Sequence, residues 1–276
     1  MSVPRESEPA DRFDFYAPQY SRFESEAAAE IRREVYGEDI GQQGWRSLDE
    51  QALIADLIRE SSLCEVLNVG CGSGGPSLAL VQQTKCRLTG VDLEASGVEH
   101  ARRLTVARGL SDMVTFETVD CNERLPLPDA MFDVVVCIDA VLHLKNRFAA
   151  LADWSRLLRP QGRVIFTDAA VVTGPISIEE LYVRASQGAF VLVPPGVNER
   201  AITASGLFLR RCEDRTQATA AIAGRWHDAR ERRAFELQKE EGQEWFARRQ
   251  RFLAMTAKLA ATGRLSRFLY VAERVT

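Results

Sequence analysis

Three absences in this sequence narrow what the chain can be. Its 35 lysines and arginines stand against 39 acidic residues, and the formal charge of −4 gives no overall attraction for nucleic-acid phosphates or anionic lipid. No run of about 18 uncharged apolar residues occurs, so no membrane-spanning helix is expected. The first residues lack the basic-then-apolar pattern of a secretory signal. We therefore expect a cytoplasmic protein whose partners are neither nucleic acid nor membrane.

Histidine is also scarce, and cysteine is scattered. The only histidines, His100, His143 and His227, have no metal-ligand spacing such as His-x-x-x-His, so no metal site is expected. The six cysteines form no Cys-x-x-Cys pair, and several fall in apolar runs that suit small buried thiols. This usage is typical of a reducing compartment.

What the sequence does contain is a regular alternation of apolar runs and amphipathic helical patterns. The apolar runs are EVLNV, RLTGV, VTFETV, FDVVVCI and GRVIFTD, followed later by LFLRRCEDRT and RFLYVAERV. Such alternation predicts an α/β fold: a Rossmann-like, mainly parallel seven-stranded sheet with helices on both faces. Ligands of this fold bind at the carboxyl ends of the strands.

The chain divides into four predicted parts. Residues 1–60 form an N-terminal helical segment that covers the ligand, with helices at roughly 20–36 and 47–60. Residues 61–170 form the sheet core, and residues 171–206, with a Pro-Pro break, form a lid or substrate insertion. Residues 207–276 supply the last two strands, separated by a charged helical region over about 217–262.

A glycine-rich loop follows the first apolar run. Its glycines are Gly70, Gly72, Gly74 and Gly75. Glycine permits positive φ and close approach of a ligand, and Pro76 then opens a helix whose first N–H groups are unpaired. Asp92 ends the next strand, where a carboxylate can accept hydrogen bonds from ribose hydroxyls. The same spacing fits a dinucleotide fingerprint, so two cofactor classes remain open at this point.

The later segments carry a family resemblance. In order and spacing, VLNVGCGSGG, TGVDLE, FDVVVCIDAVLHL and LLRPQGRVIFTD together resemble class I S-adenosylmethionine-dependent methyltransferases over about residues 63–170. The resemblance implies S-adenosyl-L-methionine as cofactor and S-adenosyl-L-homocysteine as product. It also implies a set of cofactor-binding residues, which are Asn68, Gly70, Cys71, Gly72, Gly74, Asp92, Leu93, Asp120, Cys121 and Ile138. In this set the glycine loop contacts the methionine part, Asp92 binds the ribose, and Asp120 and Cys121 lie beside the adenine. Asn68 stands where the family commonly has an acidic residue, and its amide can hydrogen-bond without a carboxylate's charge.

A second resemblance lies upstream. YGEDIGQQGW is similar to the segment that precedes the core in sarcosine and dimethylglycine N-methyltransferases, although Gly41 replaces a histidine and Gly44 comes one position late. The resemblance implies that Tyr20 and Trp45 cover the cofactor and that Tyr16 lies on the substrate side. The alternative, that these aromatics only pack a helix against the sheet, stays open.

Catalysis and substrate choice have few candidates. Methyl transfer needs mainly alignment and, for some acceptors, a proton acceptor. Asp139 and His143 follow FDVVVCI at the reacting end of the sheet, and His143 is the candidate base, with simple packing as its alternative. The candidate substrate residues Tyr182, Arg184 and Trp226 lie in the later insertions, which can equally form a dimer or helix-packing surface.

The sequence thus predicts methyl transfer from S-adenosylmethionine to a small molecule, a metabolite or natural-product intermediate, with nitrogen or oxygen favoured as acceptor. We expect a monomer or homodimer. Two alternatives remain: a protein that binds the cofactor without transfer, and a dinucleotide-dependent oxidoreductase, which the LRPQG segment and the lack of a Ser-Tyr-Lys set disfavour. A nucleic-acid methyltransferase is disfavoured because the Asn/Asp-Pro-Pro-aromatic signature is absent where IDAVLH stands.

Overall fold

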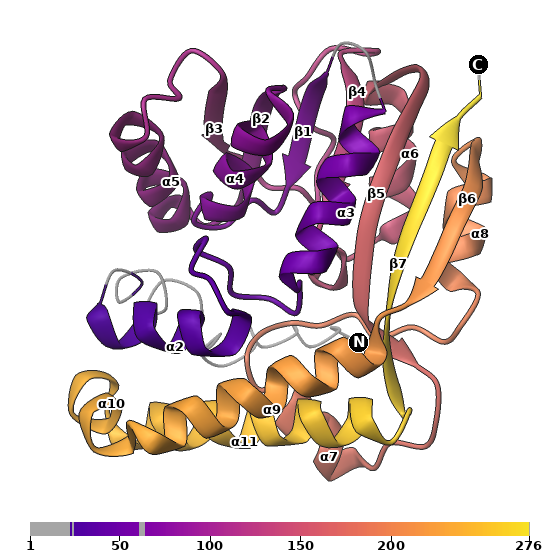
Figure 1. Ribbon diagram of the computed structural model, residues 1–276. Coiled ribbons are helices and arrows are strands. Elements are labelled where there is room, and N and C mark those ends of the chain that lie inside the picture. The colour runs from indigo at the N-terminus through magenta and orange to yellow at the C-terminus, as the bar shows by residue number, and fades with distance from the viewer. Residues whose placement is uncertain (1–22, 24, 61–63, 276) are drawn as a thin grey trace, which may run out of the picture.

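The computed structural model describes residue 23 and residues 25–60 and 64–275. Its centre is a seven-stranded sheet in the order β3-β2-β1-β4-β5-β7-β6 (Figure 1). β7 runs antiparallel to both of its neighbours, and the other pairs are parallel. The predicted Rossmann-like, mainly parallel sheet is therefore confirmed. The strands are β1 (Glu65–Val69), β2 (Arg87–Asp92), β3 (Val114–Thr118), β4 (Phe132–Cys137), β5 (Leu158–Val172), β6 (Leu207–Asp214) and β7 (Leu265–Arg274).

Helices cover both faces of this sheet. One face packs against α3, α4 and α5, whose buried residues include Ile54, Leu78 and Val98. The other packs against α6 and α8 through Trp154 and Ile202. β1 and β4 are buried almost end to end, as expected for strands covered on both faces. The helices of these two layers are α3 (Leu48–Arg59), α4 (Gly75–Thr84), α5 (Ala95–Ala107), α6 (Arg147–Leu157) and α8 (Val197–Ala204).

A third layer of helices lies across the carboxyl ends of the parallel strands (Figure 1). We call α2 (Glu26–Tyr36), α9 (Thr216–Arg232), α10 (Ala234–Glu241) and α11 (Gln243–Ala261) the helical cap. Its apolar cluster includes Ile31, Trp226 and Phe252, together with Trp45 from the loop before α3 and Ala169 of β5. Because one buried cluster joins cap and loops, the cap is packed onto the ligand-binding end of the sheet.

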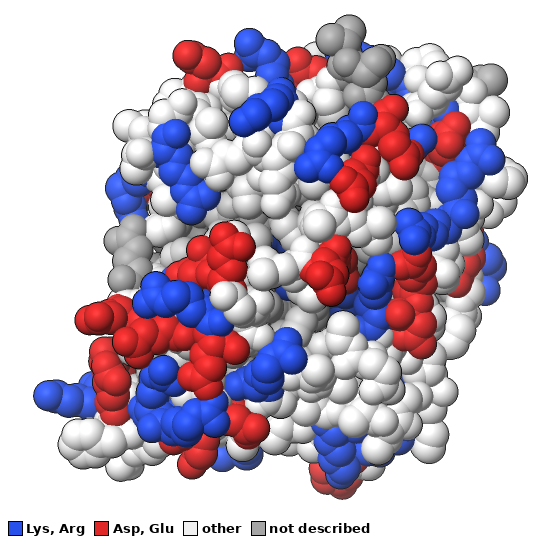
Figure 2. Space-filling model, viewed as in Figure 1, with Lys and Arg blue, Asp and Glu red and all other residues white. Residues whose placement is uncertain are grey.

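The cap carries many charged side chains on one face of the molecule. Figure 2 shows acidic and basic side chains intermixed over the cap. Arg232 and Arg233 of the α9 end pair with Glu34 of α2, and Arg233 also pairs with Glu30. Exposed ion pairs of this kind contribute only about 0–1 kcal/mol each, so the apolar cluster is the main contact between α2 and α9.

Several details differ from the sequence-based expectations. The charged region over 217–262 is three helices, because Arg233 and Gly242 interrupt it. His100, expected at the surface, is 5% exposed and meets the ring of Phe23 edge-on at 4.9 Å. β5 continues to Val172 because β7 pairs with it along that length.

The insertion over residues 171–206 has two parts. Its first helix, α7 (Ile178–Arg184), packs against α11 of the cap. α8 instead packs against α6 and β6, in the layer that covers the sheet. Only the first part of the insertion therefore lies at the cap side. No helix in the described part of the chain is long and apolar enough to span a bilayer.

Candidate functional site

The glycine loop lies between the end of β1 and the start of α4. Gly70, Gly72 and Gly74 have φ values of 72°, 55° and 80°, which side-chain-bearing residues rarely adopt. A Cβ atom at Gly70 would lie 2.4 Å from the Cβ of Ala140, and one at Gly74 would lie 2.5 Å from the Cβ of Ala101. The loop can therefore take this path only with glycine at these positions, beside the unpaired N–H groups of the α4 N-terminus.

Asp92 faces this loop from the end of β2. Its Oδ2 accepts a hydrogen bond from the Gly72 N–H at 2.7 Å, and its Oδ1 accepts one from the Glu94 N–H at 2.9 Å. Burial raises the pKa of the Asp92 carboxyl above its ordinary value. A carboxylate has about four acceptor positions, so each oxygen can accept a further hydrogen bond from a ligand hydroxyl.

Other predicted cofactor-binding residues lie just after the ends of β2, β3 and β4. Leu93 is 59% exposed, and the Asp120 carboxylate accepts hydrogen bonds from the backbone and side chain of Asn122, both at 2.9 Å. Burial, with the charge of Asp92, raises the pKa of the Cys121 thiol to about 12, so the thiol is neutral at physiological pH. Ile138 follows β4 and is half-buried against the apolar residues on the sheet face that α3, α4 and α5 cover.

Asn68 lies at the other side of the loop, near the end of β1. Its side-chain amide donates to Ser77 Oγ at 2.8 Å, and its Oδ1 is buried with no hydrogen-bond partner. Cys71 is buried, and burial raises the pKa of its thiol well above the ordinary value. The loop therefore presents one buried acceptor and no charged side chain of its own.

The segment over residues 37–46 lies across the glycine loop. A Cβ atom at Gly75 would lie 2.2 Å from the carbonyl oxygen of Ile40, so the two backbones are in direct contact. Asp39 holds the segment by an ion pair with Arg32 at 2.7 Å and accepts a hydrogen bond from the Gly41 N–H at 2.9 Å. The segment is thus fixed over the ligand end of the sheet.

A buried ion cluster joins this segment to the sheet. Asp139, directly beyond β4, accepts hydrogen bonds from the Trp45 N–H at 2.7 Å and from Arg267 Nε at 2.6 Å. Arg267 of β7 also donates to both oxygens of Glu50 at 2.6 and 2.7 Å. Burial alone would raise the pKa of the Asp139 carboxyl, but Arg267, Trp45 and Thr167 together bring it below the ordinary value. These contacts favour a positioning role for Asp139.

His143 ends the short helix η1 (Val141–His143), which follows Asp139. Its ring lies 5.0 Å from the ring of Phe190, and Phe190 in turn lies 6.4 Å from Phe252. Burial lowers the pKa of His143 to about 4, although a hydrogen bond with the Ala189 backbone opposes this shift. The imidazole is therefore neutral at physiological pH and a weak proton acceptor, and the role of His143 as a base stays a prediction.

These rings continue into an aromatic wall. Phe252 stacks on Trp45 at 6.2 Å, so Trp45, Phe252, Phe190 and His143 form one row from the N-terminal segment to the loop after β4. The backbone at residues 191 and 193 holds Phe190 in place, because Val191 N–H donates to Leu142 O at 2.8 Å and Val193 N–H donates to Ala170 O at 3.0 Å.

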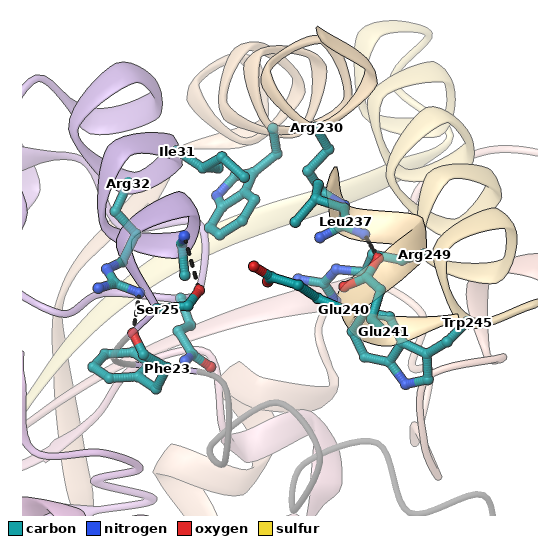
Figure 3. Close-up of a pocket in the computed structure, with 13 residues that line it drawn as sticks. Phe23, Ser25, Ile31, Arg32, Arg230, Leu237, Glu240, Glu241, Trp245 and Arg249 are labelled. Atoms are coloured by element: carbon teal, nitrogen blue, oxygen red, sulfur yellow. Dashed lines mark hydrogen bonds and ion pairs between the residues drawn. The ribbon is translucent and has the colours of Figure 1, made fainter. Parts of the chain in front are cut away.

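A cavity of about 60 Å³ opens inside the cap (Figure 3). Its lining includes Phe23, Gln43, Trp226, Trp245 and the charged residues Arg32, Arg230, Glu240, Glu241 and Arg249. In Figure 3, Glu240 and Arg249 project toward the cavity from α10 and α11. The residue after Gln43, Gly44, lies against the site, because a Cβ atom at Gly44 would lie 2.5 Å from Oδ2 of Asp139.

Comparison with known proteins identifies a domain of the chain. Residues 67–166, which hold the glycine loop, Asp92 and His143, match the methyltransferase domain. These residues therefore form a methyltransferase domain. The predicted cofactor is confirmed, and the family match gives no support to the dinucleotide-dependent alternative.

Two curated relatives align with most of the chain. The methyltransferase is 27% identical over 219 residues to the 27-O-demethylrifamycin SV methyltransferase of Amycolatopsis mediterranei (strain S699), covering 75% of this chain and 79% of that relative. It is 29% identical over 218 residues to the glycine/sarcosine/dimethylglycine N-methyltransferase of Actinopolyspora halophila, covering 76% of this chain and 36% of the relative. The chain spans 38%, 26% and 21% of the length of three other relatives.

A solved structure shares the fold. The putative sarcosine dimethylglycine methyltransferase from Galdieria sulphuraria superposes with a TM-score of 0.71 at 17% identity, covering 82% of each chain. At this identity the likeness concerns the fold alone.

The loop and its neighbours fit S-adenosylmethionine. Glycines without Cβ atoms allow close approach at the α4 N-terminus, Asp92 has acceptor positions suited to two ribose hydroxyls, and the unpartnered Asn68 Oδ1 can accept from the cofactor's ammonium group. The bound cofactor supplies a methyl group already activated on a sulfonium. The individual contacts of these residues with the cofactor remain predictions.

The predicted substrate residues of the methyltransferase fall in different places. Trp226 lines the cavity and donates its indole N–H to the Tyr36 hydroxyl at 2.9 Å. Arg184 is 2% exposed and lies over the rings of Phe190 and Phe252 at 4.7 and 5.0 Å. Tyr182 is 76% exposed, so it does not join this buried group. Tyr16 and Tyr20 lie outside the described residues.

Sequence reasoning missed three charged residues at this site. Glu50 and Arg267 complete the ion cluster with Asp139, and Arg46 is buried beside it. The one sequence signal for Glu50 was its place on the apolar face of a predicted helix, which could have indicated that its side chain is buried. Arg46 and Arg267 carry no local signal, because arginine is the common basic residue throughout this sequence.

Proposed function

We propose that this methyltransferase transfers the methyl group of S-adenosylmethionine to a nitrogen or oxygen of a small-molecule acceptor, a metabolite or natural-product intermediate, that binds under the helical cap. The observation that carries the proposal is the cap cavity, whose lining includes Gln43, one residue from the Gly44–Asp139 contact at the carboxyl end of β4. A cavity of this size admits a group of several atoms, whereas one water needs roughly 10–15 Å³.

The aromatic wall supports an acceptor with an apolar body. Trp45, Phe252, Phe190 and His143 make the ring contacts of this wall, and Trp226 lines the cavity. Two of the relatives are named for oxygen- and nitrogen-methylating enzymes, which is consistent with either acceptor atom. Alignment of the acceptor with the sulfonium then supplies most of the rate enhancement.

His143 has the role of a neutral hydrogen-bonding group in this proposal. With a pKa of about 4 it is uncharged and can accept a hydrogen bond, but it is a weak base for an amine or a phenol. We therefore assign it to orienting the acceptor, with proton removal left to the product's loss of a proton to water. Asp139 is assigned to fixing Trp45 over the site.

The insertion and the N-terminal segment complete the enclosure. We infer that residues 37–46 and the first part of residues 171–206 close over the bound molecules, with α8 as part of the sheet layers. Ala189 and Phe190 supply the part of the insertion that contacts His143.

The test is a transfer assay with labelled S-adenosylmethionine against pools of amines, phenols and carboxylates, followed by mass spectrometry of the labelled product. We expect label on a nitrogen or oxygen of one pool. Binding of S-adenosylhomocysteine without transfer to any pool would instead indicate a cofactor-binding protein that does not methylate such acceptors.

A further inference from the structure

Arg46 is a buried arginine, and two of its guanidinium nitrogens have no hydrogen-bond partner among the described residues. It lies between Trp45 and Ser47, the residue that caps α3, and is 9% exposed. Its Nε and Nη1 are buried without a hydrogen-bond partner. The neighbouring Arg267, by contrast, donates from all three nitrogens to carboxylates. Buried polar groups are nearly always paired, so an orphaned guanidinium needs a physical explanation.

The carboxylates near Arg46 do not meet its donors. Glu50 and Asp139 raise the pKa of Arg46, but burial is the larger effect and lowers it. Both oxygens of Glu50 accept from Arg267, and Asp139 accepts from Arg267, Thr167 and Trp45. The two arginines and two carboxylates balance in formal charge. What Arg46 lacks is therefore a set of hydrogen-bond acceptors rather than a counter-charge.

A guanidinium has only donors, so the group that meets it must be an acceptor. A carboxylate suits it best, because its hydrogen bonds with arginine are charge-assisted and can be bidentate. Arg46 ends the segment over residues 37–46 that lies across the glycine loop, and the two residues before it, Gly44 and Trp45, contact Asp139 beyond β4. Arg46 therefore lies at the ligand end of the sheet.

We propose that Arg46 binds the carboxylate of a bound ligand. Two ligands of the proposed reaction can supply that group: the methionine end of S-adenosylmethionine, and an acceptor that is itself a carboxylic acid. The second source rests on the proposed function, whereas the first rests only on the family. In either case Arg46 fixes an anionic end of the ligand under the N-terminal segment.

Calorimetry with a pair of adenosine ligands tests the cofactor source. S-adenosylhomocysteine carries the amino-acid end, and 5′-methylthioadenosine lacks it. If Arg46 holds the cofactor, Arg46→Met should weaken S-adenosylhomocysteine by roughly 10- to 100-fold, the loss of one charge-assisted hydrogen bond, with 5′-methylthioadenosine unchanged. Arg46→Lys should fall between parent and Arg46→Met, because lysine keeps the charge without the planar fork.

The acceptor source is tested with acetate and benzoate as probes on the protein saturated with S-adenosylhomocysteine. If Arg46 holds the acceptor, the parent should bind a probe, Arg46→Met should not, and S-adenosylhomocysteine affinity should be equal in both. Arg103→Met, at an exposed pair with Glu99, is the matched control and should leave all these affinities unchanged.

Thermal unfolding separates ligand binding from a structural role. Without ligand, Arg46→Met should melt below the parent, because the buried carboxylates lose part of their counter-charge, and it should also gain less in melting temperature from saturating S-adenosylhomocysteine or probe. Equal affinities of parent and Arg46→Met for both adenosine ligands and both probes would overturn the proposal, and so would an equal gain in melting temperature of the two proteins from these ligands. If no pool of acceptors is methylated but S-adenosylhomocysteine still binds more tightly to the parent than to Arg46→Met, the proposed function fails and the role of Arg46 stands.

Discussion

Removing Arg267 should destabilise the fold more than any exposed substitution. Its guanidinium is 0% exposed and donates three hydrogen bonds of 2.6–2.7 Å to Glu50 and Asp139. Arg267→Met leaves two carboxylates buried without their counter-charge, and breaking a buried pair in this way costs about 3–5 kcal/mol. Domains of this kind have about 5–15 kcal/mol of stability in total, so the loss is a large fraction. At roughly 2–4 °C per kcal/mol, melting should fall by about 6–20 °C.

The pH dependence gives the same cluster a second signature. The pKa of Asp139 is below its ordinary value, so the stabilisation it provides in the parent is present above the unfolded-state pKa and is lost as pH falls through the folded-state pKa. In Arg267→Met the buried carboxyls should have raised pKa values instead. Their contribution then favours folding at low pH and weakens as pH rises, so the variant should gain stability on acidification from pH 8 to about pH 5.

Urea unfolding of both proteins at several pH values is the assay. Arg210→Met is the control, because Arg210 is half-exposed and pairs with Glu273 at the surface, where a loss of at most about 1 kcal/mol is expected. A variant with Glu50→Gln, Asp139→Asn and Arg267→Met together should regain part of the lost stability. If Arg267→Met is no less stable than Arg210→Met, the cluster does not hold the N-terminal segment to the sheet as argued.

Three further predictions concern the cofactor and the acceptor. Asp92→Ala should weaken S-adenosylhomocysteine binding by about 1.5–3 kcal/mol in calorimetry. The affinity of the parent should fall as pH drops through the raised pKa of Asp92, since a protonated carboxyl loses acceptor positions. An unchanged affinity of Asp92→Ala would mean that Asp92 does not bind the ribose. His143→Ala should lower turnover with little change in cofactor affinity. A plot of the parent's rate against pH should show no inflection from a titrating histidine between about pH 5.5 and 8. A rate that rises through pH 6.5 would contradict the lowered pKa of His143. S-adenosylhomocysteine should slow limited proteolysis within residues 37–46 and 174–187, whereas equal rates with and without it would indicate permanently packed segments.

Part of the site could be predicted from the sequence because the residues that indicate it lie close together in the chain. The glycine loop, the strand before it and Asp92 lie within 30 residues, and their spacing alone predicts a nucleotide-type cradle. The place of His143 after β4 could be predicted from the sequence. Its lowered pKa could not be predicted, because the shift comes from burial by Phe190 and the insertion around it. Environment of that kind is a property of packing and not of residue type.

The sequence by itself determined the order of strands and helices, the mainly parallel sheet and the cofactor family, because hydrophobic periodicity and glycine spacing act over a few residues. The tertiary structure alone decided that β7 inserts between β5 and β6, and that Arg267 reaches Glu50 across 217 residues of chain. It also decided that Arg46 is buried with unmet donors beside them. Contacts between residues so far apart leave no local pattern in the sequence, since they depend on how the last strand and the cap close over the first helices.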